Sequence, residues 1–248
     1  MTNVVLVTGA SRGIGAATAR LAGARGYAVC VNYLASPDAA KAVARHVEEA
    51  GGKAMTFQAD TASEDDVVRM FAAVDERFGP LTALVNNAGI TGGAHAVADV
   101  DCEMLRRVFD VNVVGCFLCA REAVRRMSTK NGGAGGAIVN VSSMASRIGG
   151  AGEWVHYGAS KGAVDTLTIG LAREVADQGI RVNAVSPGLI DTDIHAAAGF
   201  PDRLEKLAPN VPMKRGGSPE EVAETVLWLM SEAASYVTGV IVPVSGGR

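Results

Sequence analysis

The chain has 248 residues, of which 48% are hydrophobic and 20% charged, and its formal net charge is −3. This length and composition suit one large core, so we expect residues 1–248 to form a single domain. The small negative charge provides no basic field for nucleic acid, and no run approaches the roughly 20 apolar residues of a membrane span. We therefore expect neither nucleic acid nor a membrane as a partner.

The four cysteines have no disulfide-framework spacing. Cys116 and Cys119 form a C-x-x-C pair, a pattern also found in redox pairs and metal sites. Neither a second cysteine pair nor suitably spaced histidines accompany them, so we favour buried side chains at a helix contact and predict no metal. Because the first expected strand begins close to the N-terminus, we expect no signal peptide and a cytoplasmic protein.

Apolar segments and amphipathic helical stretches alternate along the chain. Strands are expected near residues 3–8, 28–33, 53–58, 82–86, 136–142, 180–186 and 239–244. This alternation predicts an α/β fold in which a parallel sheet is covered on both faces. We expect a doubly wound, Rossmann-like three-layer sandwich with a seven-stranded parallel sheet.

The first expected strand leads into a glycine-rich turn. Gly9, Gly13 and Gly15 have the spacing G-x-x-x-G-x-G, and a helical pattern follows them. Glycines of this kind let the backbone approach a pyrophosphate closely, and a helix N-terminus offers free N–H donors. The Gly-Lys-Ser/Thr ending of a nucleoside-triphosphate loop is missing, which disfavours a kinase or an ATPase. An ordinary glycine-rich turn is the alternative.

Tyr157 and Lys161 stand four residues apart in an expected helix. This spacing places both side chains on one helix face. A tyrosine is a poor base at neutral pH because its reference pKa is about 10, but a nearby ammonium favours the phenolate. We therefore expect Lys161 to lower the pKa of Tyr157. The alternative is an aromatic residue at a helix start beside a solvated lysine.

Six separated motifs together resemble those of the short-chain dehydrogenase/reductase family, and they occur in the family's order. They are the glycine turn, Asn86-Asn87-Ala88-Gly89, Asn112, Ser143, the Tyr157/Lys161 pair and Pro187-Gly188. The resemblance runs from Asn3 to Gly247 and is to the branch that holds 3-oxoacyl-carrier-protein reductases and glucose 1-dehydrogenases. It implies an oxidoreductase that transfers a hydride between a nicotinamide cofactor and a carbonyl/alcohol pair of a small molecule.

The resemblance and the chemistry of the residues together suggest the catalytic roles. We expect Tyr157 to give a proton to a carbonyl oxygen, or to take the hydroxyl proton in oxidation, while Ser143 hydrogen-bonds the same oxygen. Ser142 should face the other side of its strand, because adjacent strand side chains alternate. By resemblance, Lys161 holds the nicotinamide ribose, and Asn112 positions a water between Lys161 and solvent.

Ligands of such sheets bind outside the carboxyl ends of the strands, where these motifs fall. By resemblance Asp60 contacts adenine, although it is also placed to cap a helix. Ile190 and Thr192 resemble the segment that holds the nicotinamide carboxamide. The expected cofactor-binding residues are Gly9, Ser11, Arg12, Gly13, Ile14, Gly15, Asn32, Tyr33, Ser36, Asp60, Thr61, Asn86, Ala88, Gly89, Tyr157, Lys161, Pro187, Gly188, Ile190 and Thr192.

The end of the second expected strand bears on the choice of cofactor. A carboxylate there would bind the 2′-hydroxyl of NAD, but the residues are Asn32 and Tyr33, and no carboxylate follows until Asp38. Arg12 in the glycine turn and the hydroxyl of Ser36 suit a 2′-phosphate instead. These residues predict NADP(H), with a solvated loop charge as the alternative for Arg12.

The loop before Tyr157 is expected to shape the substrate pocket. Tyr157 lies fourteen residues after Ser143, one more than in many family members. Glu153, Trp154 and His156 are the candidates to line the pocket, although His156 also suits an ordinary loop position.

A segment near 189–217 that contains Phe200 and Met213 is expected to be either a substrate lid or a surface loop. Its bases Lys206, Lys214 and Arg215, like Arg147, are scattered. They do not select among a 3-oxoacyl thioester on an acidic carrier protein, a sugar and a xenobiotic ketone.

Two broader expectations concern assembly and turnover. Apolar stripes after Asn112 and after Tyr157 and the strand Val240–Val244 predict association of chains, and the family resemblance implies a homotetramer. A redox sensor that binds NADP without turnover is the competing function, because a fold does not dictate an activity. The complete set of catalytic residues counts against a sensor.

Overall fold

The computed structural model of the chain describes residues 3–193 and 199–248. Seven parallel strands form one sheet in the order β3-β2-β1-β4-β5-β6-β7. The strands are β1 (Val4–Val7), β2 (Ala28–Tyr33), β3 (Lys53–Gln58), β4 (Ala83–Asn86), β5 (Gly136–Val141), β6 (Ile180–Pro187) and β7 (Ile241–Val244). The seven expected strands are all present, and their bounds differ from the expectation by two residues or fewer.

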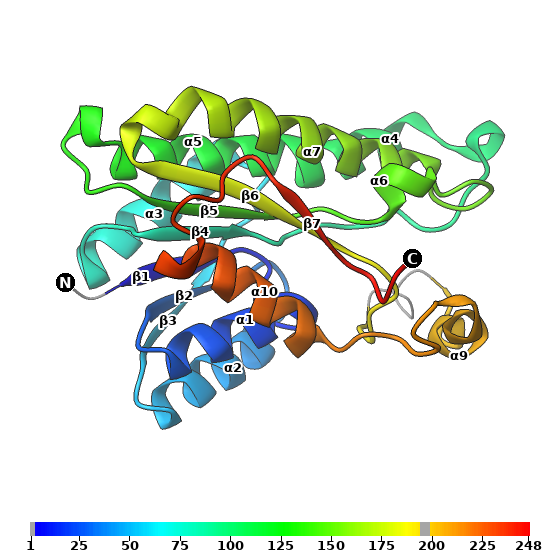
Figure 1. Ribbon diagram of the computed structural model, residues 1–248, viewed down its shortest axis with the longest axis horizontal. Helices are drawn as coiled ribbons and strands as arrows, with labels where there is room; N and C mark the ends of the chain where they lie inside the picture. The colour runs from blue at the N-terminus through cyan, green and yellow to red at the C-terminus, as the bar shows by residue number, and fades with distance from the viewer. Residues whose placement is uncertain (1–2, 194–198) are drawn as a thin grey trace.

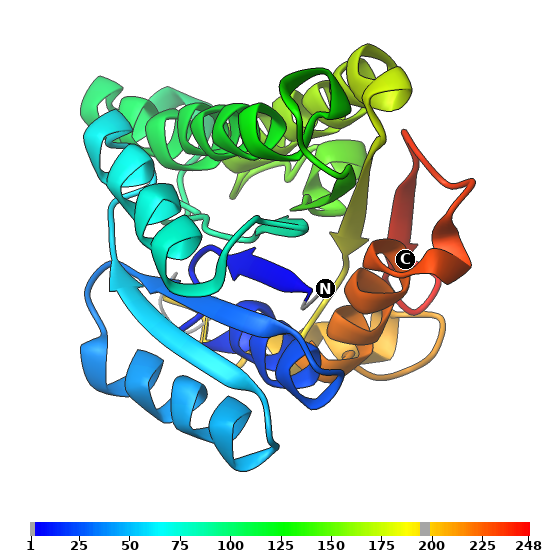
Figure 2. The same ribbon diagram turned by 90° about the vertical axis from the view of Figure 1, so that its left-hand side faces the viewer.

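Helices cover both faces of this sheet, so the predicted three-layer sandwich is confirmed (Figure 1, Figure 2). One layer contains α1, α2 and α10, and the opposite layer contains α3, α5 and α7. The helices are α1 (Gly13–Ala24), α2 (Pro37–Glu49), α3 (Glu64–Phe78), α4 (Cys102–Phe109), α5 (Gly115–Met127), α6 (Ala145–Ile148), α7 (Val155–Val175), α9 (Arg203–Leu207) and α10 (Pro219–Met230).

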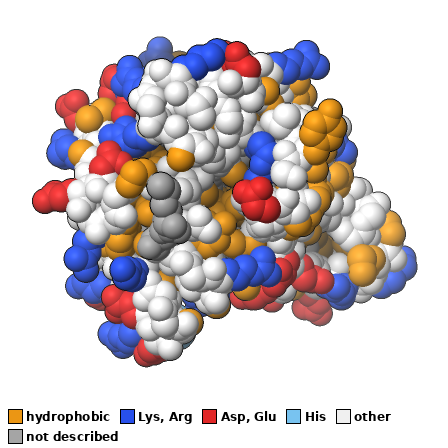
Figure 3. All heavy atoms as spheres, turned by 60° about the vertical axis from the view of Figure 1, so that its left-hand side comes forward, with side chains coloured by type: hydrophobic (Ala, Val, Ile, Leu, Met, Phe, Trp, Pro, Cys, Tyr) orange, Lys and Arg blue, Asp and Glu red, His pale blue; other side chains and the backbone are white. Residues whose placement is uncertain are grey.

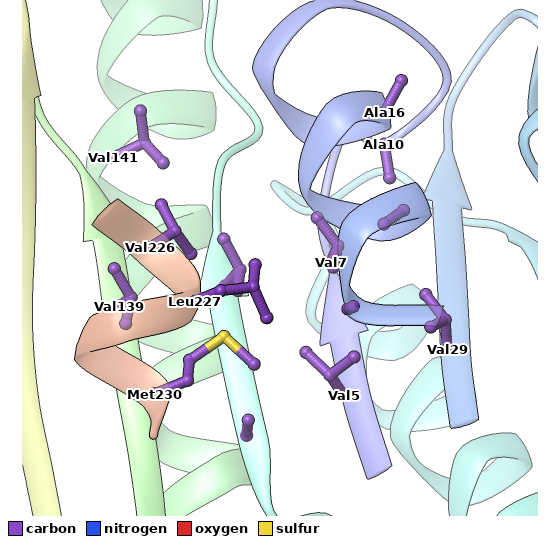
Figure 4. Close-up of a cluster of buried hydrophobic side chains, with 14 of the residues drawn as sticks. Val5, Val7, Ala10, Ala16, Val29, Val139, Val141, Val226, Leu227 and Met230 are labelled. Carbon is purple, nitrogen blue, oxygen red and sulfur yellow. The ribbon is translucent and has the colours of Figure 1, made fainter. Parts of the chain in front are cut away.

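Two hydrophobic cores lie between these layers, because successive strand side chains point to opposite faces. Val5 and Val7 of β1 pack in the core that α1 and α10 cover, together with Val226 (Figure 4). Val4 and Leu6 of the same strand belong to the core on the α3 side. All of these side chains are essentially inaccessible to water, and each contributes about 1.5–3 kcal/mol to folding. The near-continuous apolar strands of the sequence thus reflect burial on both faces.

The order of the strands fixes where a ligand can enter. Strand β1 pairs with β2 on one side and with β4 on the other, so the winding direction reverses between β1 and β4. A crevice opens outside the carboxyl ends of the strands at such a switch point. Thr8 and Asn87 follow these two strand ends. They mark the place where the functional residues are expected to gather.

No helix within the described ranges 3–193 and 199–248 is long and apolar enough to cross a membrane. On the face drawn in Figure 3, acidic and basic side chains are intermingled. That face of the described chain has no continuous basic surface.

Candidate active site

A cavity of about 690 Å³ lies at the carboxyl ends of the strands. Its wall brings together most of the residues that the sequence singled out, although they are spread over more than 180 positions of the chain. The expected residues on the wall are Gly9, Ser11, Arg12, Gly13, Ile14, Asn32, Tyr33, Ser36, Asp60, Thr61, Ala88, Gly89, Ser143, Tyr157, Lys161, Pro187, Gly188, Ile190 and Thr192.

Two expected cofactor residues, Asn86 and Gly15, do not line the cavity. The side chain of Asn86 is buried in the protein and donates to Asn140 Oδ1 at 3.0 Å and to the carbonyl of Cys116 at 3.3 Å. It therefore belongs to a polar cluster inside the fold. Gly15 packs the start of α1 against the turn: a Cβ there would lie 2.5 Å from Asn87 Nδ2.

Asn112 also lies behind the cavity wall, in a π-helical turn (Asp110–Val114) between α4 and α5. Its amide nitrogen donates to the carbonyl of Ile90 and to Ser160 Oγ, both at 2.9 Å, and its oxygen accepts the Ile90 N–H at 2.8 Å. A Cβ on Gly89 would lie 3.2 Å from Asn112 Oδ1 and 3.3 Å from Lys161 Nζ. The Asn112 side chain is thus fixed, with Gly89 between it and the lysine.

Tyr157 and Ser143 meet at the cavity wall. Tyr157 lies in the first turn of α7, is 9% exposed and is hydrogen-bonded to the Ser143 side chain. Burial raises the pKa of Tyr157, and the hydrogen bond from Ser143 acts in the opposite direction. The neighbouring Ser142 is buried and turns its hydroxyl towards the carbonyl of Lys161 at 3.4 Å. Strand β5 ends at Val141, and both serines contribute to the cavity wall, so the choice of Ser143 stays a prediction that the engaged Ser142 hydroxyl supports.

Lys161 lies one helical turn after Tyr157 and is almost completely buried. Its ammonium donates to the carbonyl of Val141 at 2.8 Å and is 5.7 Å from the centre of the Tyr157 ring. Burial lowers the pKa of Lys161 to about 8. Because desolvation of the phenol raises the pKa of Tyr157 and the Ser143 hydrogen bond is the effect that opposes it, the lowering by Lys161 stays a prediction.

The glycine turn after β1 has the shape of an anion cradle. Gly9 and Gly13 have φ of 61° and 54°, which side chains other than glycine rarely tolerate. A Cβ on Gly9 would also come within 2.9 Å of the Ala88 backbone. Asn87 Nδ2 ties the turn to the end of β4 by donating to the carbonyls of Thr8 and Gly9. The N-terminus of α1 follows, with free N–H groups at the cavity, so these residues fit a pyrophosphate.

Comparison with known proteins agrees with this geometry. A family model described as "Enoyl-(Acyl carrier protein) reductase" matches residues 9–248. The "Uncharacterized oxidoreductase YgfF" of Escherichia coli is 55% identical over 245 residues, which cover 99% of each chain. "Glucose 1-dehydrogenase 2" of Bacillus subtilis is 39% identical and is matched over 98% of this chain and 93% of that one.

A crystal structure of a short-chain type dehydrogenase/reductase from Mycobacterium marinum has a TM-score of 0.92 to this chain at 37% identity, and the match covers 99% of this chain and 94% of that one. The chain belongs to the short-chain dehydrogenase/reductase family. Both the resemblance seen in the motifs and the fold expected from them are thereby confirmed. Members of this family are oxidoreductases that use a nicotinamide cofactor, either NAD or NADP.

The end of β2 in this short-chain dehydrogenase/reductase has no acidic side chain at the cavity. Tyr33 and Ser36 lie on the wall there with Arg12, which is exposed. Asp38, the first carboxylate beyond β2, is 99% exposed and lies 3.9 Å from Lys41. Asn32 is engaged inside the fold: it accepts the Gly9 N–H at 3.0 Å and donates to the carbonyl of Ala59 at 3.1 Å.

Asp60 lies on the cavity wall and is not the N-cap of α3, which is Ser63. One oxygen of Asp60 accepts the Ala62 N–H, and the other pairs with Arg107 at 3.0 Å. Arg107 comes from α4 and also lines the cavity. Sequence reasoning missed Arg107, because the ion pair joins positions 47 residues apart and no local pattern connects them.

The substrate end of this short-chain dehydrogenase/reductase contains Glu153 and Trp154, as expected, and also Arg203, which was missed. His156 does not line the cavity: its Nε2 lies 2.8 Å from the carbonyl of Thr91, which places the ring inside the protein.

Ile190 pairs with Gly217, so the two ends of the expected lid are held together. Phe200 packs on Trp154, whereas Met213 is 60% exposed. The part of the expected lid from residue 194 to 198 lies outside the described residues.

The C-x-x-C pair lies in α5, where Cys116 and Cys119 are both buried and free. Burial raises the pKa of both thiols, that of Cys116 to about 12, so both are protonated at neutral pH. Among residues 3–193 and 199–248, no group of three or more His, Cys, Asp and Glu side chains is arranged to hold a metal ion.

Proposed function

We propose that this protein is an NADP(H)-dependent oxidoreductase that interconverts the carbonyl and alcohol groups of a small molecule, with Tyr157 as general acid and base. The observation that carries the proposal is the hydrogen-bonded Tyr157–Ser143 pair at the cavity wall with Lys161 buried beside it. When bound, the nicotinamide cofactor supplies or accepts the hydride.

The protonation states suit reduction at neutral pH. Because the pKa of Tyr157 is raised, the hydroxyl holds its proton and can give it to a carbonyl oxygen. Ser143 donates a hydrogen bond to the same oxygen. Lys161, with a pKa of about 8, is charged at neutral pH and stabilises the phenolate that remains. A water beside Asn112 would return the proton from solvent through Lys161.

The cavity wall suggests how the cofactor is held. The turn from Gly9 to Ile14 and the N-terminus of α1 bind the pyrophosphate, while Arg12, Tyr33 and Ser36 receive the 2′-phosphate. The remaining proposed contacts are Asp60, Thr61, Ala88 and Gly89 for the adenine half, and Tyr157, Lys161, Pro187, Gly188, Ile190 and Thr192 for the nicotinamide half.

The proposed enzyme is a cytoplasmic homotetramer. Exposed apolar side chains on α5, on α7 and on the π-helical turn before α5 support assembly: Phe117 is 51%, Ile169 38% and Val114 44% exposed. Val240, just before β7, is 36% exposed. Surfaces of this kind are buried in stable homo-oligomers.

The first experiment compares the parent with Tyr157→Phe. We expect turnover of a panel of ketones and β-ketoesters, followed at the nicotinamide absorbance, to fall by about 10²–10⁴-fold because the proton donor is lost. NADPH binding, followed by fluorescence titration, should remain within a factor of about three, since the ring stays in place. Tyr27→Phe is the matched control, because Tyr27 is a partly buried tyrosine that does not line the cavity.

The same titration separates the enzyme from the competing sensor. Equal turnover by the parent and Tyr157→Phe would contradict the assigned proton donor. Tight NADPH binding without turnover of any carbonyl in the panel would favour a redox sensor, for which Tyr157→Phe should have no effect.

A further inference from the structure

An aromatic cluster forms the wall of the cavity beyond Tyr157. Trp154 meets the Tyr157 ring edge-on with 6.3 Å between ring centres, and it meets Phe200 in the same way at 6.2 Å. Trp154 is only 9% exposed and lies on the cavity wall. Edge-to-face packing at these distances is favourable. Two segments that are 46 positions apart in the sequence thus meet at the substrate end.

Arg203 holds this cluster together. Its guanidinium carbon is 4.0 Å from the centre of the Trp154 ring and 5.4 Å from that of Phe200. The guanidinium also pairs with a Glu153 oxygen at 2.7 Å, and the Arg203 side chain is 12% exposed. A cation stacked on an aromatic ring and paired with a carboxylate is well fixed, and lysine cannot reproduce the flat stacking. Arg203 therefore connects the start of α9 to the loop that precedes Tyr157.

The charge at this end of the cavity is internally balanced. Glu153 neutralises Arg203, and Asp193 and Arg248, which also line the cavity within the described residues, are exposed to water. The rest of the wall here includes the apolar side chains of Met144, Ala145, Ile148 and Leu189. An anionic substrate would have to compete with Glu153 for the guanidinium and would approach a fixed negative charge. An uncharged hydrocarbon group meets no such penalty.

The basic side chains of the neighbouring segment, residues 199–217, also have partners. Lys206 pairs with Asp202 at 3.7 Å, and Arg215 pairs with Glu221 at 2.6 Å. Lys214 donates to the carbonyl of Pro209 at 2.9 Å. Every lysine and arginine in the range 199–217 of the described chain thus has an acidic or carbonyl partner. This arrangement disfavours recognition of an acidic carrier protein by that segment.

We propose that the Trp154 wall takes an uncharged, compact and mainly apolar carbonyl compound, and that Arg203, through its pair with Glu153, is a positioning residue that keeps the wall selective against anions. The inference rests on the proposed function, because it assigns the substrate class of the same cavity.

The decisive variant is Glu153→Gln, which keeps the shape of the side chain but removes the charge that balances Arg203. The probes are 4-methylcyclohexanone and 4-oxocyclohexanecarboxylate, two ketones with the same ring that differ in charge. Trp154 reports binding in a Trp228→Phe background, because the chain has two tryptophans and Trp228 is absent from the cavity wall. Oxidised NADP is added, so that the ketones bind without turnover.

We expect the parent to bind the neutral ketone about tenfold or more tightly than the carboxylate, and Glu153→Gln to shift this ratio towards the carboxylate by about tenfold. Asp202→Asn is the matched control: it removes one negative charge from the same region but outside the cavity wall, and its ratio should equal that of the parent. Tighter binding of the carboxylate by the parent, or equal ratios in Glu153→Gln and Asp202→Asn, would overturn the proposal.

A second pair of variants tests the positioning role. Arg203→Met should shift the Trp154 emission to longer wavelength and weaken binding of the neutral ketone by about fivefold to tenfold, because the wall loosens. Arg203→Lys should restore part of both effects, and NADP binding should be unchanged in both variants. An unchanged Trp154 emission in Arg203→Met would overturn the positioning role.

The outcome also distinguishes this inference from the proposed function. If the neutral ketone and the carboxylate bind in the expected ratios but no carbonyl compound is turned over, the proposed enzyme is contradicted. The proposed substrate class of the Trp154 wall is then still supported. Turnover of other carbonyl compounds, with no response of Trp154 to either cyclic ketone, would support the enzyme and overturn this inference.

Discussion

Lys161 carries a charge in a nearly water-free place, so its burial should be visible in the pH dependence of stability. Its pKa is about 8 in the folded protein, against 10.5 for an unperturbed lysine. Below pH 8 both the folded and the unfolded states hold the proton, and the full desolvation cost of about 3 kcal/mol is present. Between pH 8 and 10.5 the unfolded state binds more protons, so the contribution of Lys161 to stability rises with pH.

The substitution Lys161→Met tests this linkage. At pH 7 we expect the variant to have a free energy of unfolding about 1–3 kcal/mol higher than the parent, because the burial cost is removed and only the bond to Val141 is lost. This difference in the free energy of unfolding should shrink as the pH rises from 8 to 10. Denaturant unfolding at three pH values measures the difference. Lys41→Met, at an exposed lysine, should show no such trend; a pH-independent advantage of Lys161→Met would contradict the assigned pKa.

Arg12 is the residue on which the choice of cofactor depends. It is exposed on the cavity wall close to the end of β2, where its guanidinium can reach a 2′-phosphate. We expect Arg12→Gln to weaken NADPH binding by about tenfold or more and to leave NADH binding unchanged. Arg20→Gln is the control, because Arg20 lies in α1, the helix that follows Arg12, and pairs with Glu220 outside the cavity. A parent protein that prefers NADH would contradict the NADP assignment.

At the scale of single residues, sequence reasoning located the strand ends but not every side-chain direction. The preference for Ser143 over Ser142 stays a prediction, and it is supported by the Ser142 hydroxyl, which lies 3.4 Å from the carbonyl of Lys161. The direction of the Asn86 side chain was not predictable, because it donates to Asn140 Oδ1 within the fold and no local pattern connects the two positions. Arg203 was missed because its partners, Glu153 and Trp154, are about 50 positions away and no local pattern links them.

At the scale of elements, Arg181 of β6 anchors the end of α10. Its guanidinium donates to the carbonyls of Leu229, Met230 and Ser231 at 2.6, 3.1 and 3.2 Å. Carbonyls at a helix C-terminus lack partners within the helix, and a cation there also interacts favourably with the helix dipole. This one side chain thus satisfies the end of a helix that covers the core shown in Figure 4.

Replacing this anchor should destabilise the fold without changing the cavity. We expect Arg181→Met to lower the free energy of unfolding by about 2–3 kcal/mol and Tm by about 4–10 °C, since three carbonyls lose a charged donor. Scanning calorimetry measures the shift. Arg173→Met, at an exposed arginine of α7, should change Tm by about 1 °C or less. Equal Tm values for the two variants would show that the Arg181 hydrogen bonds contribute nothing to stability.

The order and type of the strands were predictable because each is a short apolar run between helical stretches. The π-helical turn at Asp110–Val114 was not predictable, since one extra residue in a helix leaves the surrounding apolar pattern almost unchanged. The short α9 was also missed: its five residues contain no side chain that is fully buried, so no apolar periodicity marks it.

At the scale of the whole molecule, assembly should depend on α5. Phe117 is 51% exposed there, and Val114 in the preceding π-helical turn and Ile169 on α7 are also exposed. We expect Phe117→Glu to reduce the mass measured by light scattering from four chains to two or one, because a charge buried in an interface without a partner is unfavourable. Val97→Glu, at a site 65% exposed before α4, should leave the mass unchanged. If light scattering finds the parent to be a monomer at two concentrations, the proposed tetramer is wrong.

The π-helical turn also constrains how this chain can be shortened. Each residue of an α-helix advances the chain by about 100° around the axis. Deleting one residue between Asp110 and Val114 would restore a regular helix and turn α4 by that angle relative to α5. The Asn112 amide would then lose its hydrogen bonds to Ile90 and Ser160, although the chain would still contain every proposed catalytic residue. The arrangement of the site therefore depends on the number of residues in this turn as well as on their identity.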